Sequence, residues 1–221
     1  MTSLAVVTGA NRGIGLELAR QLHARGHAVA AICRHRSPAL DALGVRVEDD
    51  CDVTLPAAWS RLAKQFAHDD IDLLVDNAGI AVPDEIESAD PAQVRRQFET
   101  NAFAPLFLTR ALLPRMRAGA KIALITSRMG SMGDNRSGGY YGYRMSKAAL
   151  NAVGVSLAHD LRSRGIAVVI LHPGAVRTEM TGNQGMLDAA EAVRGLLQRI
   201  DELTLERTGQ FLHMNGQELP W

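Results

Sequence analysis

The stretch from Thr8 to Gly15, which reads Thr-Gly-Ala-Asn-Arg-Gly-Ile-Gly, constrains the fold of this chain more than any other. Residues 4–7 before it form a short apolar run typical of a buried parallel strand, and residues 16–22 after it show helical spacing. Because glycine lacks a Cβ, such a turn can approach a pyrophosphate closely while the N–H groups at the helix start face that anion. The order therefore predicts a dinucleotide-binding turn. The glycine spacing differs from the usual G-x-G-x-x-G, so a plain glycine loop stays an alternative at this point.

Strand-like and helix-like segments alternate along the whole chain. Apolar runs lie near 4–8, 28–33, 44–47, 71–75, 121–126, 166–171 and 209–213, and helical patterns lie near 13–25, 56–67, 90–117, 143–163 and 188–204. This alternation predicts an α/β fold with a seven-stranded parallel sheet and helices on both faces. We expect residues 1–221 to form a single domain. Pro105 predicts a kink in the fourth helical pattern and Pro114 its end, whereas 34–43 is too short for a long helix.

Tyr143 and Lys147 lie four positions apart where a long helical pattern begins, so they share one helix face. A free phenol has a pKa of about 10, and a nearby ammonium favours its ionised form. The spacing predicts that Lys147 lowers the pKa of Tyr143 and makes it an acid–base group. Taken alone, the pair is more typical of an exposed helix surface.

Two further segments place polar side chains at strand ends. The run 122–125 ends at Thr126 and Ser127, and the run 73–75 continues into Asp76-Asn77-Ala78-Gly79. Open α/β sheets bind ligands at the carboxyl ends of their strands. We therefore expect Ser127 to hydrogen-bond a substrate carbonyl, with an ordinary loop as the alternative.

With these motifs the chain resembles the short-chain dehydrogenase/reductase family in its shorter, single-domain type. The resemblance rests on motifs that span nearly the entire chain: the Thr8-to-Gly15 loop, Asn77-Ala78-Gly79, Asn101, Ser127, Tyr143, Lys147, His172-Pro173-Gly174 and Thr178. It implies a Rossmann-like, doubly wound NAD(P)-binding domain. The segments Ala10–Leu16, 31–34 and 216–221 look most similar to the C-factor and Sniffer-type carbonyl reductases of that family.

The resemblance also implies roles for individual residues. Tyr143 is expected as general acid or base, Lys147 to lower its pKa and hold the nicotinamide ribose, Ser127 to orient the carbonyl, and Asn101 to support a proton-relay water. The residues expected to contact the cofactor are Gly9, Asn11, Arg12, Gly13, Ile14, Gly15, Arg34, Asp52, Val53, Asn77, Ala78, Gly79, Tyr143, Lys147, Pro173, Gly174, Val176 and Thr178.

The sequence departs from the family pattern in two places. Asp76 stands where an asparagine is usual, and the spacing from Ser127 to Tyr143 is longer than usual, with the extra residues in the glycine-rich stretch 132–139. Such a loop can bulge without moving the strand or the helix. Ser131 is therefore a reserve candidate for the serine.

The residues after the second predicted strand indicate which nicotinamide cofactor to expect. An acidic residue there usually binds a ribose 2′-hydroxyl, whereas an arginine accepts a 2′-phosphate. Between Leu18 and Leu40 there is no Asp or Glu, and the strand leads into Arg34, while Arg12 lies within the glycine loop. Because arginine binds phosphate in a bidentate manner, we predict NADP(H), with Arg12 and Arg34 as the discriminating pair. A solvated basic turn is the alternative.

The overall composition excludes several classes of function. The 24 basic and 24 acidic residues leave no formal net charge, so no nucleic-acid or membrane partner is expected. No signal peptide or long apolar stretch is present in the sequence, which predicts a cytoplasmic protein. Cys33, Cys51 and the seven histidines show no metal-site or C-x-x-C spacing, so neither a metal nor a disulfide is predicted.

The predicted reaction is the NADPH-dependent reduction of a small apolar aldehyde or ketone to an alcohol. By resemblance, residues 179–186 form a short substrate lid, and Met129, Met132 and Met180 are expected to line the pocket unless they are core filler. The two longest helical patterns carry surplus apolar positions, which fits either sheet contact or a homodimer. The alternatives are a 3-oxoacyl reductase, an oxidative alcohol dehydrogenase, or a regulatory protein that binds NADP(H) with little turnover.

Overall fold

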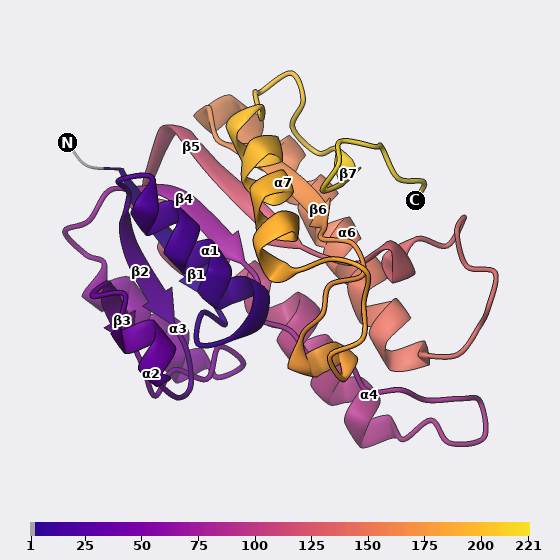
Figure 1. Cartoon of the computed structure of the whole chain (residues 1–221). Coiled ribbons are helices and arrows are strands. Elements are labelled where there is room, and N and C mark those ends of the chain that lie inside the picture. Colours follow the sequence, from indigo (N-terminus) through magenta and orange to yellow (C-terminus); the bar gives the residue numbers. More distant parts are fainter. Residues whose placement is uncertain (1–2) are drawn as a thin grey trace.

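Residues 3–221 are described by a computed structural model whose centre is a seven-stranded sheet (Figure 1). Its strands are β1 Leu4–Thr8, β2 Ala28–Ile32, β3 Arg46–Glu48, β4 Ile71–Asp76, β5 Met116–Ile125, β6 Ala167–His172 and β7 Phe211–His213. The spatial order is β3-β2-β1-β4-β5-β6-β7, and all neighbours pair in parallel. The predicted parallel sheet is thus confirmed. The direction of winding reverses between β1 and β4, where doubly wound sheets bind ligands.

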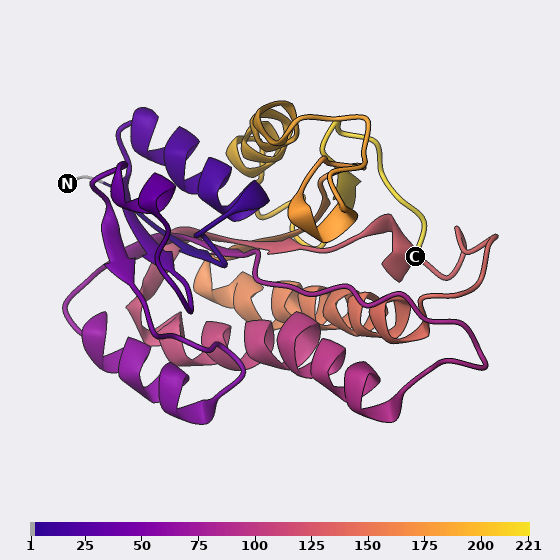
Figure 2. The same ribbon diagram turned by 60° about the horizontal axis from the view of Figure 1, so that its bottom comes forward.

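Helices cover both faces of this sheet (Figure 2). They are α1 Gly13–Ala24, α2 Pro38–Asp41, α3 Pro56–Gln65, α4 Pro91–Phe98, α5 Ala104–Leu112, α6 Tyr141–Leu161 and α7 Ala189–Asp201. Side chains alternate across a strand, and in β1 Val7 packs with α1 and α7, whereas Val6 packs with α3, α5 and α6. The strands are therefore apolar on both faces, which explains their uninterrupted apolar runs.

The predicted helix over 90–117 is not continuous. A π-helical turn at Glu99–Phe103 separates α4 from α5, and a 3-10 turn at Leu113–Arg115 ends the run. Pro105 lacks the N–H that would bond to the Asn101 carbonyl, and its ring crowds that carbonyl, so the helix widens directly before it. The predicted interruption at Pro105 is confirmed, but it is a π turn between two helices.

Strand β5 begins at Met116 rather than near residue 121. Met116 pairs with Ile71, after which the register shifts so that Lys121 pairs with Leu73. Gly119 lies in this irregular part with φ of 93°, which a side chain would disfavour. Because of this bulge, the first residues of the strand show neither an alternating nor a continuous apolar pattern in the sequence.

Candidate functional site

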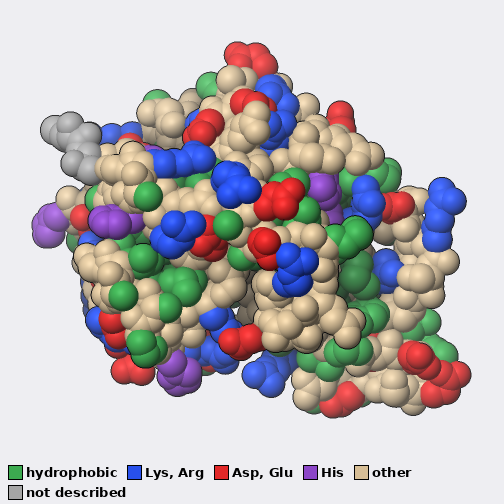
Figure 3. Space-filling view, in the orientation of Figure 1, with side chains coloured by type: hydrophobic (Ala, Val, Ile, Leu, Met, Phe, Trp, Pro, Cys, Tyr) green, Lys and Arg blue, Asp and Glu red, His purple; other side chains and the backbone are tan. Residues whose placement is uncertain are grey.

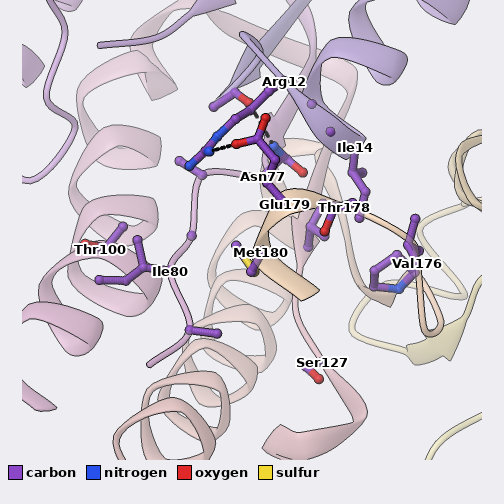
Figure 4. Close-up of a pocket in the computed structure, with 18 of the residues that line it drawn as sticks. Arg12, Ile14, Asn77, Ile80, Thr100, Ser127, Val176, Thr178, Glu179 and Met180 are labelled. Atoms are coloured by element: carbon purple, nitrogen blue, oxygen red, sulfur yellow. Dashed lines mark hydrogen bonds and ion pairs between the residues drawn. The ribbon is translucent and has the colours of Figure 1, made fainter. Parts of the chain in front are cut away.

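A cavity of about 1250 Å³ opens at the carboxyl ends of β1, β4, β5 and β6 (Figure 4). The residues predicted to contact a cofactor all line it: Gly9, Asn11, Arg12, Gly13, Ile14, Gly15, Arg34, Asp52, Val53, Asn77, Ala78, Gly79, Tyr143, Lys147, Pro173, Gly174, Val176 and Thr178. Ser127 lines it as well. The fold therefore brings together side chains from segments distant in the sequence.

The glycine turn leaves no room for a Cβ at Gly9 or Gly15. Gly9 has φ of +65°, and a Cβ on Gly15 would lie 2.2 Å from the Gly9 carbonyl oxygen and 2.5 Å from Asn77 Nδ2. Asn77 in turn donates to the Thr8 carbonyl at 2.9 Å, while Thr8 Oγ1 accepts from the Asn77 and Ala78 amides at 2.9 Å. The turns after β1 and β4 are thus held together side by side.

The start of α1 faces this space without a side-chain cap, since its N-cap residue, Arg12, makes no capping hydrogen bond. Uncapped N–H groups and the helix dipole attract an anion at such a position. A close-packed glycine turn before an uncapped helix start fits the pyrophosphate of a dinucleotide.

The two arginines predicted to discriminate between the cofactors both line the cavity but have different surroundings. Arg12 forms an ion pair with Glu179, from the segment after β6, and both side chains are largely exposed (Figure 4). Arg34 lies near Asp52: burial opposes ionisation of this carboxyl, but bonds from Thr54 and the charge of Arg34 leave its pKa below the ordinary value. The neighbouring Arg36 pairs instead with Asp41 and Asp49 and does not line the cavity. Arg34 is the arginine of this turn that faces the cavity.

Tyr143 and Lys147 lie on the first and second turns of α6 and point to the same region. Lys147 Nζ lies 5.9 Å from the centre of the Tyr143 ring and donates to the Ile125 carbonyl at 2.8 Å. Desolvation lowers the pKa of Lys147 to about 8. Burial also raises the pKa of Tyr143, and a hydrogen bond with Ser127 opposes that rise in part. The predicted net lowering of the Tyr143 pKa by Lys147 is therefore not what this structure shows, because desolvation outweighs the other effects.

Ser127 follows β5 and lies beside the Tyr143 phenol. Its Oγ also accepts from the Met129 amide at 3.1 Å, which fixes the turn. The reserve candidate Ser131 does not line the cavity: its hydroxyl donates to the Trp221 carbonyl at 3.2 Å and accepts from the Asp134 amide at 3.1 Å. The structure thus favours Ser127.

Asn101 is fully buried behind the cavity wall and does not line the cavity. Its amide donates to the Ile80 carbonyl at 2.8 Å and to Ser146 Oγ at 2.9 Å, and its Oδ1 accepts from the Ile80 amide at 2.9 Å. Ser146 Oγ in turn donates to the Tyr143 carbonyl at 2.8 Å. In this structure Asn101 connects the wall after β4 to the Tyr143 backbone. Its predicted support of a relay water stays a prediction.

The methionines divide between cavity and surface. Met129 and Met180 line the cavity as predicted, whereas Met132 is 76% exposed and lies outside it, so that prediction is wrong. Met132 belongs to the loop after β5. The apolar character of its side chain does not indicate which way this loop runs.

Ser146 and the ion pair of Glu179 carry no recognisable signal in the sequence. Ser146 lies within the Tyr-to-Lys motif, but only its contact with Asn101, 45 positions away, shows its role.

His172 lines the cavity as well. Burial, and to a smaller extent the charge of His213, lowers the pKa of His172 to about 3, so its side chain is neutral.

Within residues 3–221, no helix has the length and apolar character needed to cross a membrane. The same residues hold no group of three metal-binding side chains. Acidic and basic side chains are interspersed over the face shown in Figure 3.

The sequence profile of the family described as short chain dehydrogenase matches residues 3–187. The chain belongs to the short-chain dehydrogenase family. The resemblance inferred from the motifs is thereby confirmed, including its likeness to the C-factor and Sniffer-type members.

Two relatives in this family are similar over much of the chain. The chain is 41% identical over 225 residues to the 1-hydroxy-2-glutathionyl-2-methyl-3-butene dehydrogenase of Rhodococcus sp. (strain AD45), covering 99% of this chain and 100% of that protein. It is 46% identical over 154 residues to the C-signal protein of Myxococcus xanthus, covering 68% of this chain and 93% of that protein.

Solved structures of this family superpose closely on the fold. The NADPH-bound carbonyl reductase from chicken fatty liver has a TM-score of 0.90 and 31% identity, covering 100% of this chain and 99% of that one. The carbonyl reductase Sniffer of D. melanogaster has a TM-score of 0.91 and 30% identity, covering all of both chains. The fold is therefore that of the doubly wound carbonyl reductases.

Proposed function

We propose that the protein uses NADPH to reduce the carbonyl of a small apolar aldehyde or ketone to an alcohol. The observation that carries this proposal is that Ser127, Tyr143 and Lys147 line the same cavity as the glycine turn. The similarity to an NADPH-bound carbonyl reductase supports it. When bound, the nicotinamide supplies the hydride.

Tyr143 holds the proton that reduction requires. A phenol whose pKa lies above its ordinary value keeps its proton at neutral pH. Reduction requires a proton for the developing alkoxide, and Tyr143 Oη is the donor that we assign, with Ser127 Oγ orienting the carbonyl. Lys147, buried beside the Tyr143 ring, places a positive charge where the phenolate forms after proton transfer.

We assign the cofactor as NADP(H) from the basic side chains at the cavity end next to β2. Arg34 and Arg12 present guanidinium groups there, and arginine matches phosphate geometry. The walls near Ser127 include Met129 and Met180, which suit an apolar substrate because their side chains adapt in shape.

The test is NADPH oxidation by the purified protein with a panel of aldehydes, ketones and quinones, repeated with NADH. Tyr143→Phe should abolish turnover while NADPH still binds. Tyr141→Phe is the matched control, since Tyr141 lies on the same helix turn but outside the cavity, and it should keep activity. Full activity in Tyr143→Phe would overturn the assigned role.

A second candidate is a regulatory or signalling protein that binds NADP(H) with little turnover. The similarity to the C-signal protein is the observation that favours it. Tight NADPH binding by the wild-type protein without turnover across the panel would support this candidate. A 3-oxoacyl reductase or an oxidative alcohol dehydrogenase would instead be distinguished by the substrates that react.

We further propose that residues 1–221 form one NAD(P)-binding domain that acts in the cytoplasm and assembles as a homodimer. Phe103 and Met145 support the homodimer, since both apolar side chains are about half exposed. They lie within 90–117 and 143–163, the two long helical patterns with surplus apolar positions. A monomeric mass in solution would remove the homodimer from the proposal, and cell fractionation tests the location.

A further inference from the structure

Helix α6 carries Tyr143 near its start but has no capping side chain of its own. Its N-cap residue, Tyr140, has a left-handed backbone with φ of 53° and makes no side-chain capping bond. Left-handed conformations are unfavourable for a bulky residue such as tyrosine, so the surrounding structure must hold this one in place. The N–H groups that begin α6 therefore need acceptors from elsewhere in the chain.

Asp84 supplies those acceptors from the connection between β4 and α4. One carboxylate oxygen accepts from the Tyr141 amide, the other accepts from the Gly142 amide at 3.2 Å, and the Asp84 carbonyl accepts from the Tyr140 amide at 2.8 Å. Asp84 is only 9% exposed, although its neighbours on both sides are exposed. A carboxylate at a helix start satisfies these donors and is also favoured by the helix dipole.

The segment that carries Asp84 is itself fixed. Gln97 Oε1 accepts from the Val82 amide at 2.9 Å, and Asn101 holds both polar backbone groups of Ile80. A Cβ on Gly142 would lie 2.4 Å from Gln97 Nε2, so α4 and the start of α6 are in close contact. Asp84 thus belongs to a segment whose backbone is hydrogen-bonded to buried side chains of neighbouring helices.

We propose that Asp84 is a positioning residue for Tyr143. It holds the first turn of helix α6, and this turn carries the Tyr143 phenol. This inference rests on the proposed carbonyl reduction. Tyr143 lies two positions after Tyr141, so fraying of the first turn displaces its phenol from Ser127. Lys147 lies one turn further and is held independently by its bond to the Ile125 carbonyl.

Loss of the Asp84 carboxylate should therefore reduce the rate of the chemical step and leave cofactor binding intact. A displacement of about 1 Å at a reacting group can cost about 100-fold, so we expect kcat of Asp84→Ala to fall about 10- to 100-fold. The dissociation constant for NADPH should stay within about twofold of wild type, because Lys147 and the glycine turn remain in place. Asp84→Asn keeps one acceptor oxygen and should recover much of the lost kcat.

The matched control is Asp90→Ala. Asp90 lies in the same connection and caps the neighbouring helix α4, where its Oδ1 accepts from the Ala92 amide at 3.0 Å. Removing this cap is expected to lower the free energy of unfolding by about 1 kcal/mol while leaving kcat unchanged. An equal fall of kcat in Asp90→Ala and Asp84→Ala would overturn the inference, as would a parallel loss of NADPH binding in Asp84→Ala.

Hydrogen–deuterium exchange of the NADPH-bound protein gives a second readout that does not depend on turnover. In Asp84→Ala the amides of Tyr141, Gly142 and Tyr143 should exchange faster than in wild type, whereas those of residues 147–161 should not. Unchanged exchange at the start of α6 would also contradict the inference. Wild-type protein without any carbonyl reduction would instead refute the proposed function, and the exchange experiment would still decide whether Asp84 holds this turn.

Discussion

Arg12 and Glu179 form an ion pair that connects the glycine turn after β1 with the segment after β6 (Figure 4). Both residues line the cavity and both side chains are largely exposed, so the pair lies on the solvent side of the cavity. The Glu179 carboxylate is therefore paired with an arginine that we assign to the 2′-phosphate of NADP(H). A bound 2′-phosphate would compete with Glu179 for Arg12.

Removing the negative charge of Glu179 should strengthen binding of NADPH but not of NADH. An exposed ion pair is worth at most about 1 kcal/mol, so the gain in affinity for Glu179→Gln should not exceed about fivefold. Calorimetric titration with both cofactors measures the difference. Asp188→Asn is the control, since it breaks the pair with Arg177 in the same segment but outside the cavity. A gain that is equal for NADH and NADPH would contradict competition for a phosphate.

Replacing Arg34 with Asp should move the cofactor preference from NADPH toward NADH. The substitution removes a guanidinium that faces the cavity and supplies the carboxylate that binds a ribose 2′-hydroxyl. Loss of a charge-assisted hydrogen bond costs about 1.5–3 kcal/mol, which corresponds to a change of about 10- to 150-fold in the ratio of kcat/KM values. Arg36→Ala should leave that ratio unaltered, because Arg36 faces Asp41 and Asp49. The assignment fails if the ratio is the same in Arg34→Asp and wild type.

Asp76→Asn should stabilise the protein at neutral pH. Asp76 is buried at the end of β4, where desolvation raises its pKa from 3.8 to about 8 despite a hydrogen bond from Thr109. In the window between these values the unfolded chain has released a proton that the folded protein retains. The free energy of unfolding of wild type therefore falls with rising pH, by up to about 1.4 kcal/mol per pH unit.

The asparagine variant lacks this titration, so its stability advantage should grow from about pH 5 to about pH 8. Urea unfolding at several pH values in this window, with both proteins side by side, measures the two slopes. Parallel slopes for wild type and Asp76→Asn would show that Asp76 does not carry the effect.

Lys147→Met should remove turnover and yet stabilise the fold. Burial lowers the pKa of Lys147 from 10.5 to about 8, so below that pH the folded protein holds a desolvated charge that the unfolded chain exposes to water. An apolar side chain of similar length avoids this cost, and we expect a gain of about 1–3 kcal/mol at neutral pH.

The stability advantage of Lys147→Met should depend on pH. Between about 8 and 10.5 the unfolded chain retains the Lys147 proton and the folded protein has lost it, so wild-type stability rises and the advantage of methionine shrinks. Thermal unfolding of both proteins across this pH range measures the difference in stability. A methionine variant less stable than wild type at neutral pH would show that the bond to the Ile125 carbonyl outweighs the desolvation.

The sheet and most of the cavity lining follow from local patterns in the sequence. Uninterrupted apolar runs identify buried parallel strands, and the polar residues after them must meet at one edge of the sheet. Ser127, Asn77 and the glycine turn can therefore be assigned to one site even when the conformation of the loops between them is unknown.

Other features depend on contacts that no local pattern reveals. The bond between Asp84 and the start of α6 joins residues 57 positions apart, and nothing around Asp84 in the sequence indicates a cap. The pKa of Tyr143 depends on how deeply the fold buries it, whereas the sequence only shows that Lys147 is near. The irregular start of β5 is likewise set by its pairing with β4.

The two walls of the cavity differ in how they are fastened. On the β4 side, Asn101, Gln97 and Asp84 fix the backbone from 80 to 84 against two helices through buried side chains. On the opposite side, residues 179–186 are mostly exposed, and the pair with Arg12 ties them across the opening. We therefore expect substrate and product to pass on the side of residues 179–186, where one exposed ion pair can break without disturbing the buried bonds that hold the helix of the Tyr143 phenol.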